Sequence, residues 1–263
     1  MFSQEERCLY RRSPLGLVIC QLRFPEILTI ESTLPAQFQE AIREDFPRYS
    51  LRKEAAPPKV TGAPGNLSLQ NAPSTNNYQF QSQDGVWKIN LTSKFISLSC
   101  GRYTRWEDFA KRLDEPLAAF IRIYKPAYFE RIGLRYLNFF SRKALDLEGV
   151  PFRDLFAPAY LGLLDDDDVS EQACAQCSTD AELAIKGGCR VKLHAGPGML
   201  KTPGQEQDKE VKFIFDQDLF MPGNVPVNLS TGALETLHGQ AFAIFRDAIT
   251  GLMHHSLDPV EID

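Results

Sequence analysis

Two arginines and two aspartates have the types and spacing that best fit the binding of a polar or charged group. Arg131 and Arg135 flank Gly133 in a strand-like segment, so the guanidinium groups share one face and the glycine leaves space between them. Asp216 and Asp218 share a face of another predicted strand for the same reason. Either the arginines bind an anionic or polar ligand or a partner's acidic segment, or all four residues form ion pairs inside the fold, which we favour. A metal pair at the aspartates is less favoured.

Three other polar residues extend this candidate ligand- or partner-binding site. Asn138 follows Arg135 on the same segment and Tyr103 precedes a predicted helix, so we expect both beside the arginines. His238 lies in the apolar stripe of the final predicted helix, where a hydrogen-bonded histidine at a helix interface is the default interpretation. A hydrolase or nuclease would need this histidine to converge with the two aspartates, which sequence spacing does not show.

The sequence lacks the motifs that usually mark catalysis or cofactor binding. It has no nucleophile elbow, His-Glu-x-x-His helix, phosphate loop or dinucleotide-binding glycine fingerprint. We therefore expect no catalytic residue and no cofactor, and an activity based on binding.

Four residues have the side-chain types of a zinc site, namely Cys174, Cys177, Cys189 and His194. In an extended segment 170–186, however, the first two cysteines would point to opposite faces of a strand. We therefore predict no metal site and interpret the cysteines as structural or surface residues, with zinc binding as the weaker alternative.

The elements that must position these residues follow from hydrophobic periodicity and turn signals. An apolar run at Leu15–Phe24 predicts a buried strand. A helix follows, capped by Thr33 and stopped by Pro47. The stretch 52–77 is rich in proline, glycine and small polar residues, so it predicts a mobile loop.

A hairpin is the clearest local signal in the first half. Segments 78–82 and 86–91 flank a turn at Asp84-Gly85, and a third strand is predicted at Phe95–Cys100. Thr104 and Glu107 then form a capping-box pattern that opens a long amphipathic helix reaching Tyr124.

The second half repeats this order of elements. A strand is predicted at 129–140, a short helix at 152–164, a hairpin at 183–193, a strand at 211–215 and a long helix at 230–252. The fold class we predict is α+β, with two successive β-α-β-β-β-α units, 1–126 and 127–263, in one integrated domain. Long helices would pack on one face of a curved antiparallel sheet.

Composition and charge fit a folded globular protein. Hydrophobic residues make up 43% of the 263 residues and charged residues 24%, and the formal net charge is −5. This balance does not favour nucleic acid as a partner, and no signal peptide or membrane span is evident. We expect a cytoplasmic protein with reduced cysteines.

Several segments together carry a family resemblance. They are Pro14-Leu15, Asp84-Gly85-Val86-Trp87, Ser97-Leu98, Tyr103 to Phe109, Tyr128 to Asn138, and the closing helix from His238 to Thr250. The most specific parts are a Tyr-x-x-Trp-x-x-Phe helix start and an Arg-Ile-Gly-Leu-Arg-Tyr-x-Asn strand. Over nearly its whole length the chain resembles a sporadically distributed family of bacterial and archaeal proteins of about this size. Such a distribution implies mobile genes, as in defence or toxin control, and the resemblance provides no catalytic residue that could be assigned here.

These observations predict a non-enzymatic interaction or regulatory protein in a mobile antiviral-defence or toxin-control cassette. Its partner would be a protein encoded nearby, and no membrane partner is expected. The alternative is a small-molecule or nucleotide-binding domain in which Arg131 and Arg135 receive an anionic group.

Overall fold

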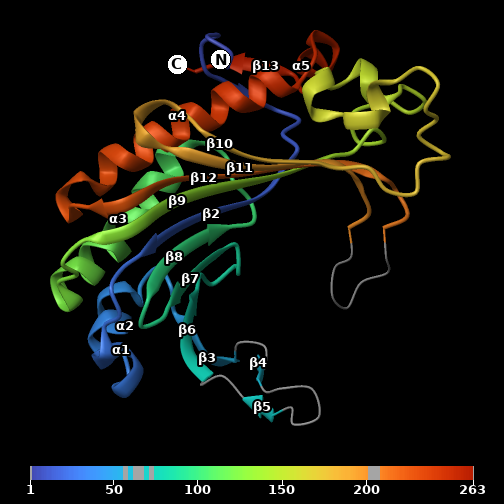
Figure 1. The fold of residues 1–263 in the computed structure, drawn as a ribbon. Coiled ribbons are helices and arrows are strands. Elements are labelled where there is room, and N and C mark those ends of the chain that lie inside the picture. The colour runs from blue at the N-terminus through green and yellow to red at the C-terminus, as the bar shows by residue number, and fades with distance from the viewer. Residues whose placement is uncertain (1, 56–58, 62–67, 71–73, 201–207, 263) are drawn as a thin grey trace.

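The chain folds around a nine-stranded antiparallel sheet in this computed structural model, which describes residues 2–55, 59–61, 68–70, 74–200 and 208–262 (Figure 1). Its strands are β2 (Leu15–Arg23), β3 (Arg48–Ala55), β6 (Ser74–Gln81), β7 (Trp87–Leu91), β8 (Phe95–Cys100), β9 (Phe129–Phe140), β10 (Thr179–Ala184), β11 (Arg190–Gly198) and β12 (Lys212–Val225). Their order across the sheet is β10-β11-β12-β9-β2-β8-β7-β6-β3. Strands from the two halves of the chain meet where β2 pairs with β9.

Two small sheets lie outside this large one. β1 (Cys8–Tyr10) pairs with β13 (Pro259–Glu261), which brings the two ends of the chain together. β4 (Lys59–Thr61) pairs with β5 (Ser68–Gln70) beyond the ends of β3 and β6.

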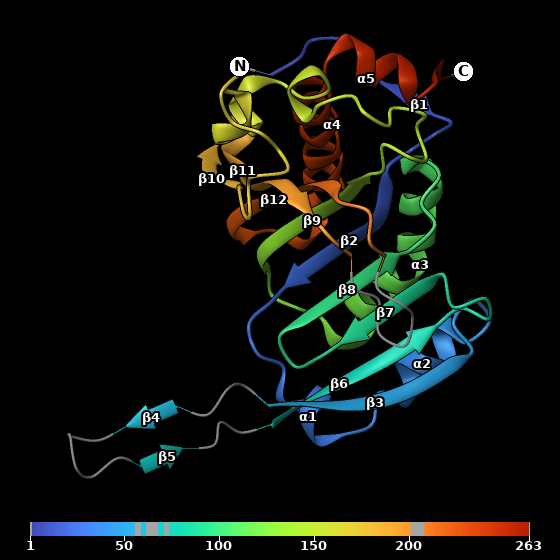
Figure 2. The same cartoon turned by 90° about the vertical axis from the view of Figure 1, so that its right-hand side faces the viewer.

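The described residues also form five α-helices (Figure 2). They are α1 (Leu28–Ser32), α2 (Ala36–Ile42), α3 (Trp106–Tyr124), α4 (Ser230–Ala248) and α5 (Gly251–Ser256). α4 lies against β9 and β12, and α3 packs with α2. The long helices and the sheet therefore share one core.

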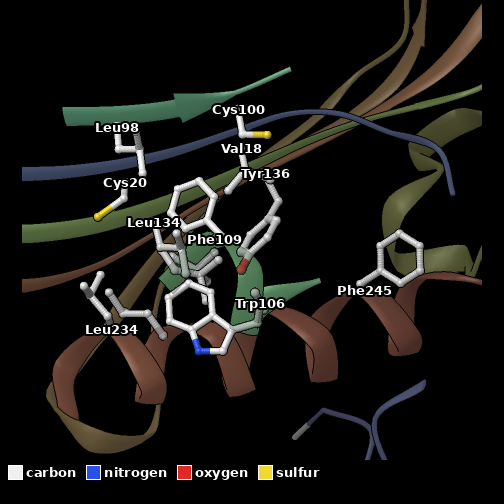
Figure 3. Packing of buried hydrophobic residues seen from close by; sticks show 14 of the residues in the cluster. Val18, Cys20, Leu98, Cys100, Trp106, Phe109, Leu134, Tyr136, Leu234 and Phe245 are labelled. Atoms are coloured by element: carbon white, nitrogen blue, oxygen red, sulfur yellow. The ribbon is translucent and has the colours of Figure 1, made fainter. Parts of the chain in front are cut away.

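Alternating side chains explain why the strands bury one face. In β9, Ile132, Leu134 and Tyr136 are buried, whereas the intervening Arg131 and Arg135 reach solvent. Figure 3 shows Leu134 and Tyr136 extending from the sheet toward the helices. Burial of this apolar face provides the main stabilisation of the fold.

The structure confirms an α+β chain with a large antiparallel sheet and most of the predicted elements. The predicted strands at 95–100 and 129–140 and the long helix ending at Tyr124 agree with β8, β9 and α3. The predicted hairpins correspond to β6–β7 and β10–β11.

Both predicted helix caps are wrong. Thr33 is the C-cap of α1, and α2 begins after Pro35. The capping box at Thr104 and Glu107 does not form, because Arg105 is the N-cap of α3 and the Thr104 hydroxyl donates to Asp108 Oδ2 at 2.9 Å.

The stretch 52–77, predicted to be a loop, begins and ends in paired strands. Arg52 pairs with Asn77 and Ala55 with Ser74, so β3 and β6 continue into the stretch. Its residues 56–58, 62–67 and 71–73 lie outside the described part of the chain.

Backbone breaks divide two predicted helices. The predicted helix 152–164 is three short 3-10 turns, because Pro158 starts a new turn and Gly162 has a positive φ of 57°. The predicted final helix is divided after Ala248, whose carbonyl accepts from Ala157 N at 2.9 Å. Thr250 then caps α5 by accepting from Met253 N.

Candidate functional site

The sheet divides the predicted site residues between its two faces. Asn138 is three residues from Arg135, so its side chain lies on the opposite face of β9, where its Nδ2 donates to the Phe215 carbonyl at 3.1 Å. Together with Tyr103 and His238 it lines a pocket on the helix side. The expectation that Asn138 and Tyr103 stand beside the arginines is therefore wrong.

On the face away from α3 and α4, the arginines are paired with the aspartates. Arg131 Nη2 donates to Asp218 Oδ1 at 2.6 Å, and its guanidinium lies over the Phe220 ring. Arg135 Nε donates to Asp216 Oδ1 at 2.8 Å, with a second contact from Nη2 to Oδ2. This hydrogen bond and the neighbouring charge raise the pKa of Arg135. The favoured interpretation, ion pairing inside the fold, is the one the geometry supports.

The charges on this face continue in register across four strands. Arg135 of β9 lies opposite Asp218 of β12, which lies opposite Lys192 of β11, and Lys192 lies opposite Glu182 of β10. Neighbouring side chains in this row alternate in sign. The face therefore balances much of its own charge, which weakens the case for an anionic ligand at Arg131 and Arg135.

The histidine and the two aspartates that a hydrolytic site would need lie on different faces of the sheet. His238 extends from α4 into the helix-side pocket, whereas Asp216 and Asp218 are held by arginines on the other face. These three residues do not converge.

The helix-side pocket lies between the sheet, α4, the start of α3 and the N-terminal segment. Its volume is about 110 Å³. Its lining residues are Arg7, Cys8, Leu9, Tyr10, Ser13, Leu15, Tyr103, Thr104, Trp106, Tyr136, Asn138, Gln217, His238, Ala241, Phe242 and Phe245. Most of this surface is apolar, with a few polar groups, as is usual for sites that hold small molecules.

Hydrogen bonds connect four of the polar side chains in this pocket. Arg7 Nη1 lies 2.6 Å from His238 Nε2, and Tyr136 Oη lies 2.8 Å from His238 Nδ1. Tyr136 is also hydrogen-bonded to Tyr103. The N-terminal segment and β9 thus meet through the imidazole of α4.

Burial, and secondly the nearby positive charge of Arg7, lower the pKa of His238 to about 4. The ring is therefore neutral at neutral pH. An arginine only donates hydrogen bonds, so Nε2 must accept from Arg7 and Nδ1 must carry the hydrogen. Burial likewise raises the pKa of Tyr103 and of Tyr136, which keeps both hydroxyls protonated.

Trp106 fixes the orientation of the imidazole. Its ring stacks on His238 with centroids 4.6 Å apart and planes 11° apart. Its Nε1 donates to Glu235 Oε1 at 2.9 Å. Figure 3 shows Tyr136 and Trp106 in the space between the sheet and α4.

Sequence reasoning missed several pocket residues, among them Arg7, Tyr136 and Gln217. The least expected of them is Gln217. It is 1% exposed, and no donor among the described residues reaches its side-chain Oε1. A signal was present in the sequence, since Phe213, Phe215 and Leu219 occupy buried positions on the same face of the strand. An amide in such an apolar series indicates a buried polar site.

The weaker zinc alternative finds no supporting geometry. Segment 170–186 is not one strand, because β10 begins at Thr179, so the parity argument for Cys174 and Cys177 does not hold. Cys189 is buried, and His194 Nδ1 pairs with Asp180 at 2.8 Å. Within the described residues, no three or more His, Cys, Asp or Glu side chains are grouped to hold a metal ion.

No protein-family model matches the sequence, and no curated protein is significantly similar to it. In the described ranges, none of the helices has the length and apolar character needed to cross a bilayer.

Proposed function

We propose that the protein is a binding module that holds a small molecule in the pocket between its sheet, α4 and the N-terminal segment. The observation that carries this proposal is Gln217, whose buried amide oxygen has no donor among the described residues. Leaving such a group unpaired costs about 1–3 kcal/mol, so a ligand that donates to it recovers stability.

The hydrogen bonds in the pocket favour ligand binding over catalysis as its function. Its imidazole has both nitrogens engaged, by Arg7 and by Tyr136, and is stacked on Trp106. An imidazole held in this way positions its neighbours instead of acting as a free base.

The two tryptophans provide a direct test, because Trp106 lines the pocket and Trp87 does not. In a ¹H–¹⁵N spectrum of the protein, titration with a library of small uncharged molecules should shift the Trp106 indole signal and leave Trp87 unchanged. Binders should also raise the melting temperature. If no compound shifts Trp106 selectively, the proposal fails.

A second candidate function is the presentation of a charged surface to a partner protein. The row from Arg135 to Glu182 lies on the sheet face away from α3 and α4, and alternating charges suit a partner with a complementary polar surface. The test is binding of proteins encoded next to this gene. Arg135→Gln should weaken binding with little change in melting temperature, whereas Arg122→Gln, an exposed arginine of α3, should have no effect. Equal binding by both variants would contradict this function.

The finer architecture that we propose is a pair of related units, 1–126 and 127–263. Within the large sheet, the first strand of each half pairs with the last, β2 with β8 and β9 with β12, and a long helix follows. The halves differ in several elements. For example, β3 adds an edge strand to the first, and 3-10 turns replace a helix in the second. Separate expression of each half, followed by circular dichroism, would show whether either folds alone.

The biological setting remains a proposal based on the sequence resemblance. Membership of the sporadically distributed family would place the gene in a mobile defence or toxin-control cassette in the cytoplasm. Deleting the gene together with its neighbours should then change survival after phage infection, and fractionation should recover the protein with cytoplasmic markers. Unchanged survival, or recovery elsewhere, would count against this setting.

A further inference from the structure

In the hydrogen-bond chain from Arg7 through His238 and Tyr136 to Tyr103, each group donates to the next. Because Arg7 donates to His238 Nε2, His238 Nδ1 donates to the Tyr136 oxygen. The Tyr136 hydrogen is then available for Tyr103, whose oxygen accepts it. A hydroxyl carries a single hydrogen, and Tyr136 does not accept that of Tyr103, so it remains to be donated.

An acceptor lies on the strand next to Tyr136. Gln217 pairs in register with Tyr136, and its Oε1 is buried without a donor. The pocket therefore presents a hydroxyl hydrogen from Tyr103 and an amide oxygen from Gln217, and a ligand must match both.

The charge of the pocket is already balanced. Arg7 is the one described lining residue with a formal charge at neutral pH, and its Nη2 contacts Glu107 Oε1. This contact lowers the pKa of Glu107, which stays ionised. A carboxylate or phosphate ligand would have to compete with Glu107 for Arg7, and would enter a mostly apolar space without another cation.

The remaining walls are apolar. Leu9 and Leu15 lie on the side of the N-terminal segment and β2, and Ala241, Phe242 and Phe245 extend from α4. These side chains favour a compact apolar ring or chain next to the polar end of a ligand.

We propose that the ligand is an uncharged carboxamide or lactam attached to a small apolar group. Its carbonyl accepts from the Tyr103 hydroxyl, and its N–H donates to Gln217 Oε1. This inference rests on the proposed binding function and adds the chemical class of the ligand. It replaces the anionic ligand predicted for Arg131 and Arg135.

Three probes of similar shape separate the relevant chemistries. Benzamide carries both the acceptor and the donor, benzoate carries a charge, and toluene carries neither polar group. Binding is measured by calorimetry and by the shift of the Trp106 indole signal, which shows that a probe occupies this pocket. We expect affinity in the order benzamide, toluene, benzoate.

Variants of the two polar residues test the assignment. Tyr103→Phe and Gln217→Met should each weaken benzamide about tenfold and leave toluene within about twofold. Two matched controls lie away from the pocket: Tyr160→Phe, whose hydroxyl bonds to Asp247, and Gln79→Met, whose amide bonds to Asn90. Both should bind benzamide like the unmodified protein, and circular dichroism verifies that every variant is folded.

The possible failures are distinguishable. If benzoate binds at Trp106 as tightly as benzamide, or if benzamide is insensitive to both substitutions, the ligand class is wrong but the pocket still binds small molecules. If none of the three probes shifts Trp106 at millimolar concentration, the ligand class is overturned, and the wider library titration decides the binding function.

Discussion

Gln217 of β12 lies directly across from Tyr136 of β9, and both side chains project to the helix side of the sheet. They differ in one respect. The Tyr136 hydroxyl is bonded to His238, whereas the Gln217 Oε1 is buried without a donor among the described residues. A cross-strand pair at the floor of one pocket thus combines a satisfied polar group with an unsatisfied one.

This contrast predicts that Gln217→Met stabilises the protein. Methionine has a similar volume and removes the buried amide, so the free energy of unfolding should rise by about 1 kcal/mol. Urea unfolding followed by circular dichroism measures it. The matched control is Gln79→Met, which should lower stability by about 1 kcal/mol because Gln79 Nε2 donates to Asn90 Oδ1 at 3.2 Å. A Gln217→Met protein less stable than the original would contradict the prediction.

His238 should make stability depend on pH in the acidic range. Burial and the positive charge of Arg7 lower its pKa to about 4, below its ordinary value of 6.5, so the unfolded chain binds a proton that the folded protein excludes. Stability is therefore complete above pH about 6.5 and is lost as the pH falls toward about 4. The loss is at most about 3 kcal/mol, and less for a half-buried ring.

The measurement compares urea unfolding of the original protein and of His238→Gln at intervals between pH 7 and 4. The groups around the imidazole are Arg7, Glu107, Tyr136 and Trp106, and of these only Glu107 also titrates under acidic conditions. Its carboxyl is present in both proteins, so the difference between the two curves isolates His238. Parallel curves over this range would show that the histidine does not titrate as described.

Replacing Arg7 should raise the pKa of His238. The positive charge of Arg7 opposes protonation of the ring 2.6 Å away, so Arg7→Met removes one of the two causes of the lowered pKa. Burial remains, so the pKa should stay below its ordinary value. NMR titration of the His238 imidazole signals in both proteins measures the change. An unchanged His238 titration would show that Arg7 does not act on the ring.

Local patterns predicted the elements of this fold well. In β9 the alternation of apolar and polar residues is strong enough that sequence alone defines both ends, Phe129 and Phe140. Helix starts were predicted less well, because Thr104 and Thr33 have capping side chains but other contacts determine where α3 and α2 begin. The break after Ala248 arises from a backbone pairing with residue 157, a contact that no local pattern encodes.

The pocket could not be predicted because its residues come from distant parts of the chain. Arg7 and His238 are separated by 231 positions, and their contact depends on the N-terminal segment crossing α4. Sequence spacing did group Arg131, Arg135 and the aspartates, because positions two apart on strands share a face. It misplaced Asn138, which lies an odd number of residues from Arg135.

Adding a single methyl group at Gly196 should destabilise the protein, because the segment containing Cys177 packs against this position. A Cβ at Gly196 would lie 2.5 Å from the Cys177 carbonyl oxygen, so Gly196→Ala must displace backbone and should cost about 2 kcal/mol. Gly239 is the matched control: it lies in α4, and a Cβ there meets nothing within 4 Å. Gly239→Ala should stabilise the protein by about 0.5–1 kcal/mol, because alanine favours the helix. Urea unfolding of both variants measures these changes in the free energy of unfolding. If Gly196→Ala is harmless, the segment before β10 does not pack against β11, and the corrected position of Cys177 is wrong.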